Sequence, residues 1–197
     1  SVIHSNDPAI VAKFATVPTG RVLVADDHGA ERGLAVVEHL LETGGCEVEV
    51  ATPDRHVGFD LATPLGPAYL RMLYDGGVTM TTDHRLVRVE AVADGGGDRR
   101  AVLVNEYTRA EVVRTVDHVV VEHGVVPDEN LFTDLRPESA NDGVTDLEAL
   151  AAGRSQPAFA LLGDDGEGPL LFRVGDCVAS RDVASALLDA RRLLQHL

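Results

Sequence analysis

A glycine, an aspartate and a cysteine near the end of the chain, Gly175-Asp176-Cys177, have the types and the position to contact a bound nucleotide. They follow an apolar run, residues 170–174, that predicts a short strand, and they precede an amphipathic stretch that predicts a helix over 183–197. Glycine lets a ligand approach the backbone, and the first turn of a helix offers free N–H groups. We therefore expect the Asp176 carboxylate beside those N–H groups, where it can accept a hydrogen bond from a ribose or ribityl hydroxyl.

A second candidate turn follows an apolar run at 22–25 and reads Asp26-Asp27-His28-Gly29. Apolar residues then recur at helical spacing as far as Gly44-Gly45, and residues 48–51 predict the next strand. This order of strand, helix and strand is typical of a dinucleotide-binding βαβ unit. Of the glycines that normally cradle the pyrophosphate only Gly29 and Gly33 are present, and the two carboxylates would repel phosphate. The turn therefore predicts the fold without tight NAD binding.

The next segments predict a helix over 67–74, strands over 78–82 and 85–92, and a hairpin with strands over 101–107 and 111–116. An apolar strand at 118–121 then ends at Gly124. Together these elements predict an α/β protein: a Rossmann-like three-layer βαβ unit with a β-meander.

Two strings resemble the C-terminal flavin-binding region of the Old Yellow Enzyme-related flavoproteins, the group of trimethylamine dehydrogenase, 2,4-dienoyl-CoA reductase and dimethylglycine demethylase. One is His-Gly-Val-Val-Pro-Asp at 123–128, and the other is Phe-Arg-Val-Gly-Asp-Cys-Val-Ala-Ser-Arg at 172–181. Gly124 keeps the family's place, whereas Glu122 and His123 depart from its usual small residues. The resemblance implies that Gly124, Gly175, Asp176 and Cys177 bind the cofactor, FAD or ADP.

The resemblance also implies a domain plan and a parent enzyme. It divides the chain into a connector (1–20), an NAD-like Rossmann insert (21–116) and the C-terminal part of an FAD-like domain (117–197), so that pieces of an FAD-like fold flank the insert. The family's flavin barrel, with its FMN, iron–sulfur cluster and catalytic residues, would lie upstream. We therefore expect a portion of a flavin-dependent oxidoreductase, inactive alone, whose partner is the remainder of the parent flavoenzyme.

Composition excludes several other functions. The chain carries 32 acidic against 17 basic residues, a net charge of −15, which argues against nucleic acid and anionic membranes as partners. No apolar run reaches the roughly 20 residues that span a bilayer, no leader peptide opens the sequence, and Cys46 and Cys177 lack metal or disulfide spacing. These features predict a cytoplasmic protein without a metal site.

Some alternatives stay open at this point. The acidic excess also fits a salt-adapted, halophilic protein, and a homo-oligomer is possible. A non-catalytic interaction or regulatory module that kept a Rossmann-like fold and lost its nucleotide is the competing function.

Overall fold

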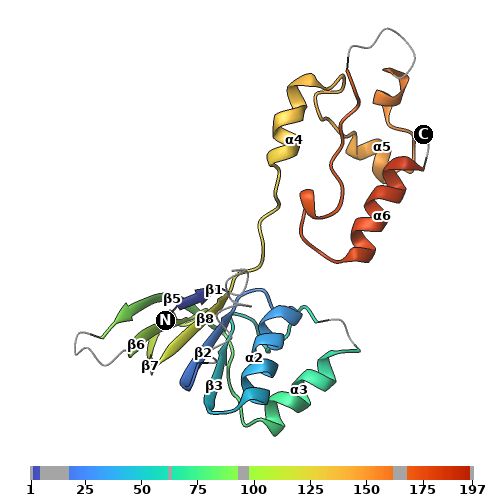
Figure 1. Cartoon of the computed structure of the whole chain (residues 1–197). Coiled ribbons are helices and arrows are strands. Elements are labelled where there is room, and N and C mark those ends of the chain that lie inside the picture. Colours follow the sequence, from blue (N-terminus) through green and yellow to red (C-terminus); the bar gives the residue numbers. More distant parts are fainter. Residues whose placement is uncertain (1, 5–17, 62–63, 93–97, 162–167, 196–197) are drawn as a thin grey trace. The chain divides into compact units, whose positions relative to one another are not determined.

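The structure is a computed structural model that describes residues 2–4, 18–61, 64–92, 98–161 and 168–195. The chain forms two compact units, Ser1–Gly124 (unit 1) and Val125–Leu197 (unit 2). Figure 1 shows the helices and strands of both units.

Unit 1 is built on a five-stranded parallel sheet with strand order β1-β8-β2-β3-β4. The strands are β1 (Val2–His4), β2 (Gly20–Asp26), β3 (Cys46–Ala51), β4 (Thr79–Thr81) and β8 (His118–Glu122). In β2 the consecutive residues Val22, Leu23, Val24 and Ala25 are all buried. An uninterrupted apolar strand is what a sheet covered on both faces requires.

One face of this sheet is covered by α2 (Glu31–Thr43) and α3 (Gly66–Asp75), as Figure 1 shows. The helical spacing of Leu34, Val37 and Leu40 places their side chains on one face of α2, where they form a core with Val22 and Val24. The helix α2 ends at Gly44, with φ +74°, as the glycine pair predicted.

The opposite face packs on an antiparallel meander of β5 (His84–Ala91), β6 (Arg99–Asn105) and β7 (Glu111–Val116). Ala101 and Leu103 of β6 contact the core residues Leu23 and Val119 of the parallel sheet. Helices, parallel sheet and meander form three layers, so the predicted α/β fold class is confirmed.

The strand β8 joins the sheet of unit 1 although the predicted insert ended at residue 116. Asp117, just before β8, accepts a hydrogen bond from the backbone N–H of Arg21 at 2.7 Å. Gly20 has φ +89°, and a Cβ there would lie 2.6 Å from Asp117 Oδ2, so any other residue would be strained and would displace the Asp117 carboxylate. Within the predicted connector, Val2–His4 form the edge strand β1. The assignment of the segments to NAD-like and FAD-like domains stays a prediction.

Unit 2 consists of short helices joined by long connections. Its α-helices are α4 (Asn130–Leu135), α5 (Leu147–Ala151) and α6 (Val183–Leu194). Three 3-10 turns accompany them: η1 (Arg136–Glu138), η2 (Pro157–Leu161) and η3 (Gly175–Cys177). The structure assigns no strand to the described residues of unit 2.

The predicted strand at 170–174 is therefore wrong for this structure. A strand needs a neighbouring strand to pair with. Here the backbone of Leu171 pairs instead with one side chain: its N–H donates to Asn141 Oδ1, and its carbonyl accepts from Asn141 Nδ2, both at 2.8 Å. The buried amide of Asn141 thus satisfies the groups that a sheet would otherwise pair.

Candidate functional site

The turn that carries the predicted cofactor residues is η3, which packs on α6. Gly175 is buried and has φ +61°, a conformation that L side chains rarely adopt. A Cβ at this position would lie 2.9 Å from the Cβ of Ala186 in α6. The contact between turn and helix therefore explains the glycine, a reason that differs from the ligand approach inferred from sequence.

Asp176 stands exposed on this turn, while Cys177 beside it is half-buried. The Asp176 Oδ1 atom lies 3.5 Å from the backbone N of Arg181, the outer limit of a hydrogen bond. A carboxylate with four acceptor positions and one such long contact keeps capacity for a ligand hydroxyl.

The expectation that Asp176 opens the final helix is wrong. The N-cap of α6 is Asp182, whose carboxylate accepts a hydrogen bond from the N–H of Ser185 at 2.6 Å. This cap lowers the pKa of Asp182, mainly through the bond from Ser185. The sequence carries the signal for this cap, an aspartate directly before the first residue of the apolar periodicity.

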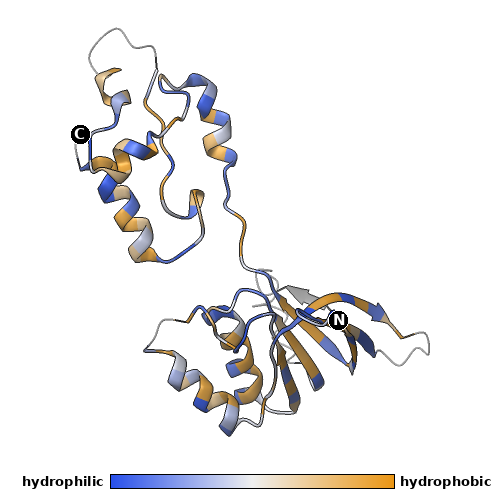
Figure 2. Ribbon diagram, turned by 180° about the vertical axis from the view of Figure 1, so that it is seen from behind, coloured by the Kyte–Doolittle hydropathy of each residue, from blue (hydrophilic) through white to orange (hydrophobic). Residues whose placement is uncertain are grey.

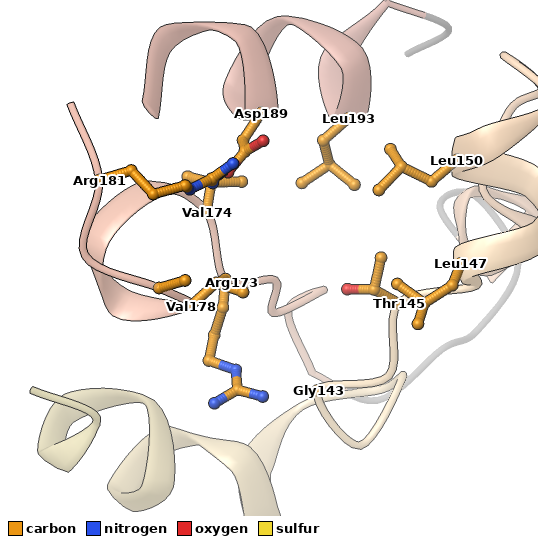
Figure 3. A pocket seen from close by; sticks show the side chains of 11 residues that line it. Gly143, Thr145, Leu147, Leu150, Arg173, Val174, Val178, Arg181, Asp189 and Leu193 are labelled. Carbon is orange, nitrogen blue, oxygen red and sulfur yellow. Dashed lines mark hydrogen bonds and ion pairs between the residues drawn. The ribbon is translucent and has the colours of Figure 1, made fainter. Parts of the chain in front are cut away.

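A hollow of about 510 Å³ opens beside η3, between α5 and α6 (Figure 3). Its wall is mostly apolar and comes from three separate parts of unit 2: Leu147 and Leu150 of α5, Leu193 of α6, and Val174 and Val178 on either side of η3. This volume lies in the range of small-ligand sites.

Two arginines line the same hollow, and both already have acidic partners. Arg181 pairs with Asp189 of α6. Arg173 pairs with Glu129 at 2.8 Å and lies over the ring of Phe132, 4.5 Å from its centroid. Because these charges are compensated within unit 2, the hollow suits an apolar occupant better than a pyrophosphate.

The Asp26 turn of unit 1 lies at the carboxyl end of β2, where dinucleotide folds bind phosphate. Asp26 is buried, and its Oδ1 accepts hydrogen bonds from the N–H groups of His28 at 3.0 Å and Gly29 at 2.9 Å. Burial raises the pKa of Asp26 more than these two bonds lower it, and the neighbouring Glu122 raises it further. The backbone donors that a pyrophosphate would use are thus held by a side chain.

The second carboxylate of the turn, Asp27, lies beside a histidine and an arginine of unit 1. Its Oδ2 lies 2.8 Å from His123 Nδ1 and 3.7 Å from Arg85 Nη1. Gly124 follows with φ +75°, and its N–H donates to Glu122 Oε1 at 2.6 Å. Gly124 therefore belongs to unit 1, whereas Gly175, Asp176 and Cys177 belong to unit 2.

The described parts of the chain carry neither a metal-binding cluster nor a membrane-spanning helix. There, no three His, Cys, Asp or Glu side chains gather closely enough to hold a metal ion. Within the same residues, every helix is too short or too polar to cross a bilayer.

Comparison with known sequences points to one group of enzymes. The chain is 42% identical over 180 residues to N,N-dimethylglycine/sarcosine dehydrogenase of Chromohalobacter salexigens, which covers 91% of this chain and 25% of that protein. It is 36% identical over 181 residues to a probable N-methylproline demethylase of Rhizobium meliloti, covering 91% and 26%. The chain thus spans about a quarter of the length of these relatives. No family model matches it.

Solved structures give the same fold. Histamine dehydrogenase from Rhizobium sp. 4-9 aligns with 98% of this chain and 25% of its own, with a TM-score of 0.62 and 20% identity. Thioredoxin reductase of T. acidophilum aligns with 92% and 57%, with a TM-score of 0.53 and 14% identity. The chain is therefore homologous to the C-terminal region of dimethylglycine dehydrogenase and the Old Yellow Enzyme-type demethylases, and it shares the fold of the matching region of histamine dehydrogenase.

Proposed function

We propose that the chain is the cofactor-holding region of a flavin-dependent amine dehydrogenase or demethylase, and that Asp176 binds a hydroxyl of FAD or ADP. The observation that carries the proposal is the exposed carboxylate of Asp176 on a turn that the packing of Gly175 against α6 holds in place. The 42% identity to a dimethylglycine/sarcosine dehydrogenase supports the enzyme class.

The residues of unit 2 fit one end of such a cofactor. Asp176 can accept from a ribose or ribityl hydroxyl, and Cys177 lies on the same turn. Arg173 and Arg181 are both paired with acids, so we assign neither of them to the phosphates. FAD, when bound, supplies a redox centre for electron exchange with the rest of the enzyme, whereas ADP supplies none.

Unit 1 has a different role in this proposal. The N–H groups of His28 and Gly29, at the turn where a dinucleotide fold binds phosphate, already donate to Asp26, so we propose that unit 1 does not bind NAD(H). The competing function, a non-catalytic module that has lost its nucleotide, stays the alternative for the chain as a whole.

The test uses the enzyme encoded by the complete reading frame, with Asp176→Ala and Asp176→Asn. A hydrogen bond to a charged acceptor contributes on the order of 1.5–3 kcal/mol, so Asp176→Ala should weaken FAD or ADP binding about 10- to 150-fold. Asp176→Asn keeps an acceptor oxygen and should lose less. Bound nucleotide per chain is measured after release by denaturation.

The matched control is Asp182→Ala, which removes the cap of α6. It should lower stability by about 0.5–2 kcal/mol while affinity for the nucleotide stays unchanged in the folded protein. Wild-type nucleotide content in Asp176→Ala would remove Asp176 from the site.

A further inference from the structure

The connection that leads into η3 runs beside the turn that follows η1. The Ala140 N–H donates to the Pro169 carbonyl at 2.9 Å. Gly168 has φ +104°, and a Cβ there would overlap the carbonyl oxygen of Glu138, so the two backbones pass close to each other. The hydropathy of the apolar run 170–174, which continues this connection, can be followed in Figure 2. The two segments are therefore joined by their backbones at the start of the run.

One buried side chain, the amide of Asn141, completes this pairing. Its Nδ2 donates to the carbonyls of Leu171 at 2.8 Å and of Val144 at 3.1 Å, and its Oδ1 accepts from the Leu171 N–H at 2.8 Å. Both N–H donors of the amide are thus in use. A donor and an acceptor on one amide match the C=O and the N–H of a single residue, as a neighbouring strand would. These bonds therefore fix the register of Leu171.

The position of Asp176 follows from that register. Four residues lie between Leu171 and Asp176. Because successive Cα atoms are held about 3.8 Å apart, a connection this short carries a shift of Leu171 on to η3. At its other end, η3 is held by the packing of Gly175 on Ala186. Asp176 itself is exposed, so the place of its carboxylate depends on how these two attachments hold its backbone.

We propose that Asn141 is a positioning residue for the nucleotide: it holds Leu171 in the register that presents the Asp176 carboxylate to a ribose or ribityl hydroxyl. The proposal rests on the proposed function. A hydroxyl donates to an oxygen over about 2.5–3.0 Å, so a shift of about 1 Å at η3 would lose the bond. Asn141 acts through Asp176 and contacts no part of the nucleotide itself.

The variant Asn141→Asp tests this role, because it changes hydrogen bonding and keeps the size of the side chain. An ionised carboxylate cannot donate, so it would repel the Leu171 carbonyl and shift the connection. When protonated, the same side chain regains one O–H donor. Burial raises the pKa of such an aspartate, and the carboxylates of Asp142, which pairs with Arg136 at 3.1 Å, and of Asp146, which lines the same hollow, act in the same direction.

The affinity is measured in the enzyme of the complete reading frame, with the nucleotide, FAD or ADP, that denaturation releases from wild type. At about pH 7.5, Asn141→Asp should bind it about 10- to 150-fold more weakly than wild type, the loss expected for Asp176→Ala. At about pH 5.5, it should come within about threefold of wild type at the same pH, because protonation restores the donor. Asn141→Ala, which cannot titrate, should bind weakly at both pH values, and it keeps the test open if the aspartate variant does not fold.

Gln156 provides the matched control, since it is a second buried amide that pairs with both backbone groups of one residue of unit 2. Its Oε1 accepts from the Asp146 N–H at 2.8 Å, and its Nε2 donates to the Asp146 carbonyl at 3.0 Å. Asp146 caps α5 and is not part of the connection into η3. Gln156→Glu should therefore lose stability and regain it at low pH, while the folded enzyme keeps the wild-type affinity for the nucleotide at both pH values.

Two results would overturn the positioning role: wild-type affinity in Asn141→Asp at about pH 7.5, or an equal loss of affinity in Gln156→Glu. The double variant Asp176→Ala/Asn141→Asp separates this role from the proposed function. Its second change should weaken binding by less than about threefold, because the bond that it misplaces is already absent. Additive losses would reject positioning through Asp176 and leave the cofactor role of Asp176 intact. Wild-type affinity in Asp176→Ala would instead reject the proposed function, and the positioning role with it.

Discussion

Replacing Gly175 by alanine should destabilise unit 2 through a contact that the structure locates. The φ of +61° costs an L residue about 1–2 kcal/mol. The new Cβ would lie 2.9 Å from Ala186 Cβ, and overpacking of this kind costs about 1–3 kcal/mol. The sum is about 2–5 kcal/mol, which is a change of more than tenfold in the opening equilibrium of α6.

Gly153 is the matched control, because it lies in the same unit with φ +63° and a Cβ there meets nothing within 4 Å. Gly153→Ala should therefore cost only the conformational part, about 1–2 kcal/mol. Alanine also stiffens the unfolded chain, but this effect is common to both variants and cancels in the comparison. The assay is native-state hydrogen exchange of the α6 amides in each variant.

A second substitution isolates the contact. In Gly175→Ala/Ala186→Gly the clash disappears, so the double variant should be more stable than the sum of the two single effects predicts. Equal losses for Gly175→Ala and Gly153→Ala, or strict additivity in the double variant, would refute the conclusion that packing on α6 requires this glycine.

Three further predictions concern charge. The pKa of Asp26 is raised above 3.8, mainly by burial, so the folded state holds this proton more tightly than the unfolded one. The protonated Asp26 carboxyl therefore contributes to the stability of the folded state at low pH, and this contribution is lost as the pH rises through the folded pKa. Chemical unfolding should show that Asp26→Asn becomes more stable than wild type from about pH 4 upwards. A calorimetric titration should show no binding of NAD(H) at low-micromolar concentration, and Asp27→Asn should strengthen any weak binding. Asp26→Gly should instead destabilise unit 1, because it leaves the backbone N–H groups of His28 and Gly29 without their acceptor. The charge of −15 should make the unfolding temperature rise from low to molar salt, and a flat or falling trend would contradict this.

Much of unit 1 could be predicted from its sequence. The continuous apolar run of β2 and the helical spacing of Leu34, Val37 and Leu40 are local patterns, and the residues that they predict to be buried do lie in the core. The edge strand β1 was missed because three residues carry too little periodicity for a prediction. Its place is fixed by pairing with β8, more than 100 residues further along the chain.

The candidate site was predicted less well, for a related reason. The apolar run at 170–174 has the local pattern of a strand. In this structure, however, the backbone of Leu171 pairs with the side chain of Asn141, 30 residues earlier in the chain, and a local sequence pattern cannot predict such a partner. The Gly175–Ala186 contact likewise depends on how turn and helix meet. The cap at Asp182 could be predicted from the sequence, and it shows that Asp176 is not needed to start the helix.

The strand order of unit 1 has a consequence for synthesis. Among the strands that the structure describes, β1 pairs only with β8, and β8 lies between β1 and β2. The ribosome makes β1 well before β8, and β1 gains its partner strand only after Glu122 has left the exit tunnel. Until then β2 keeps one open edge that another nascent chain could pair with. The assembly of unit 1 should therefore be a late event in translation, and a pause before β8 should lengthen its exposure to aggregation.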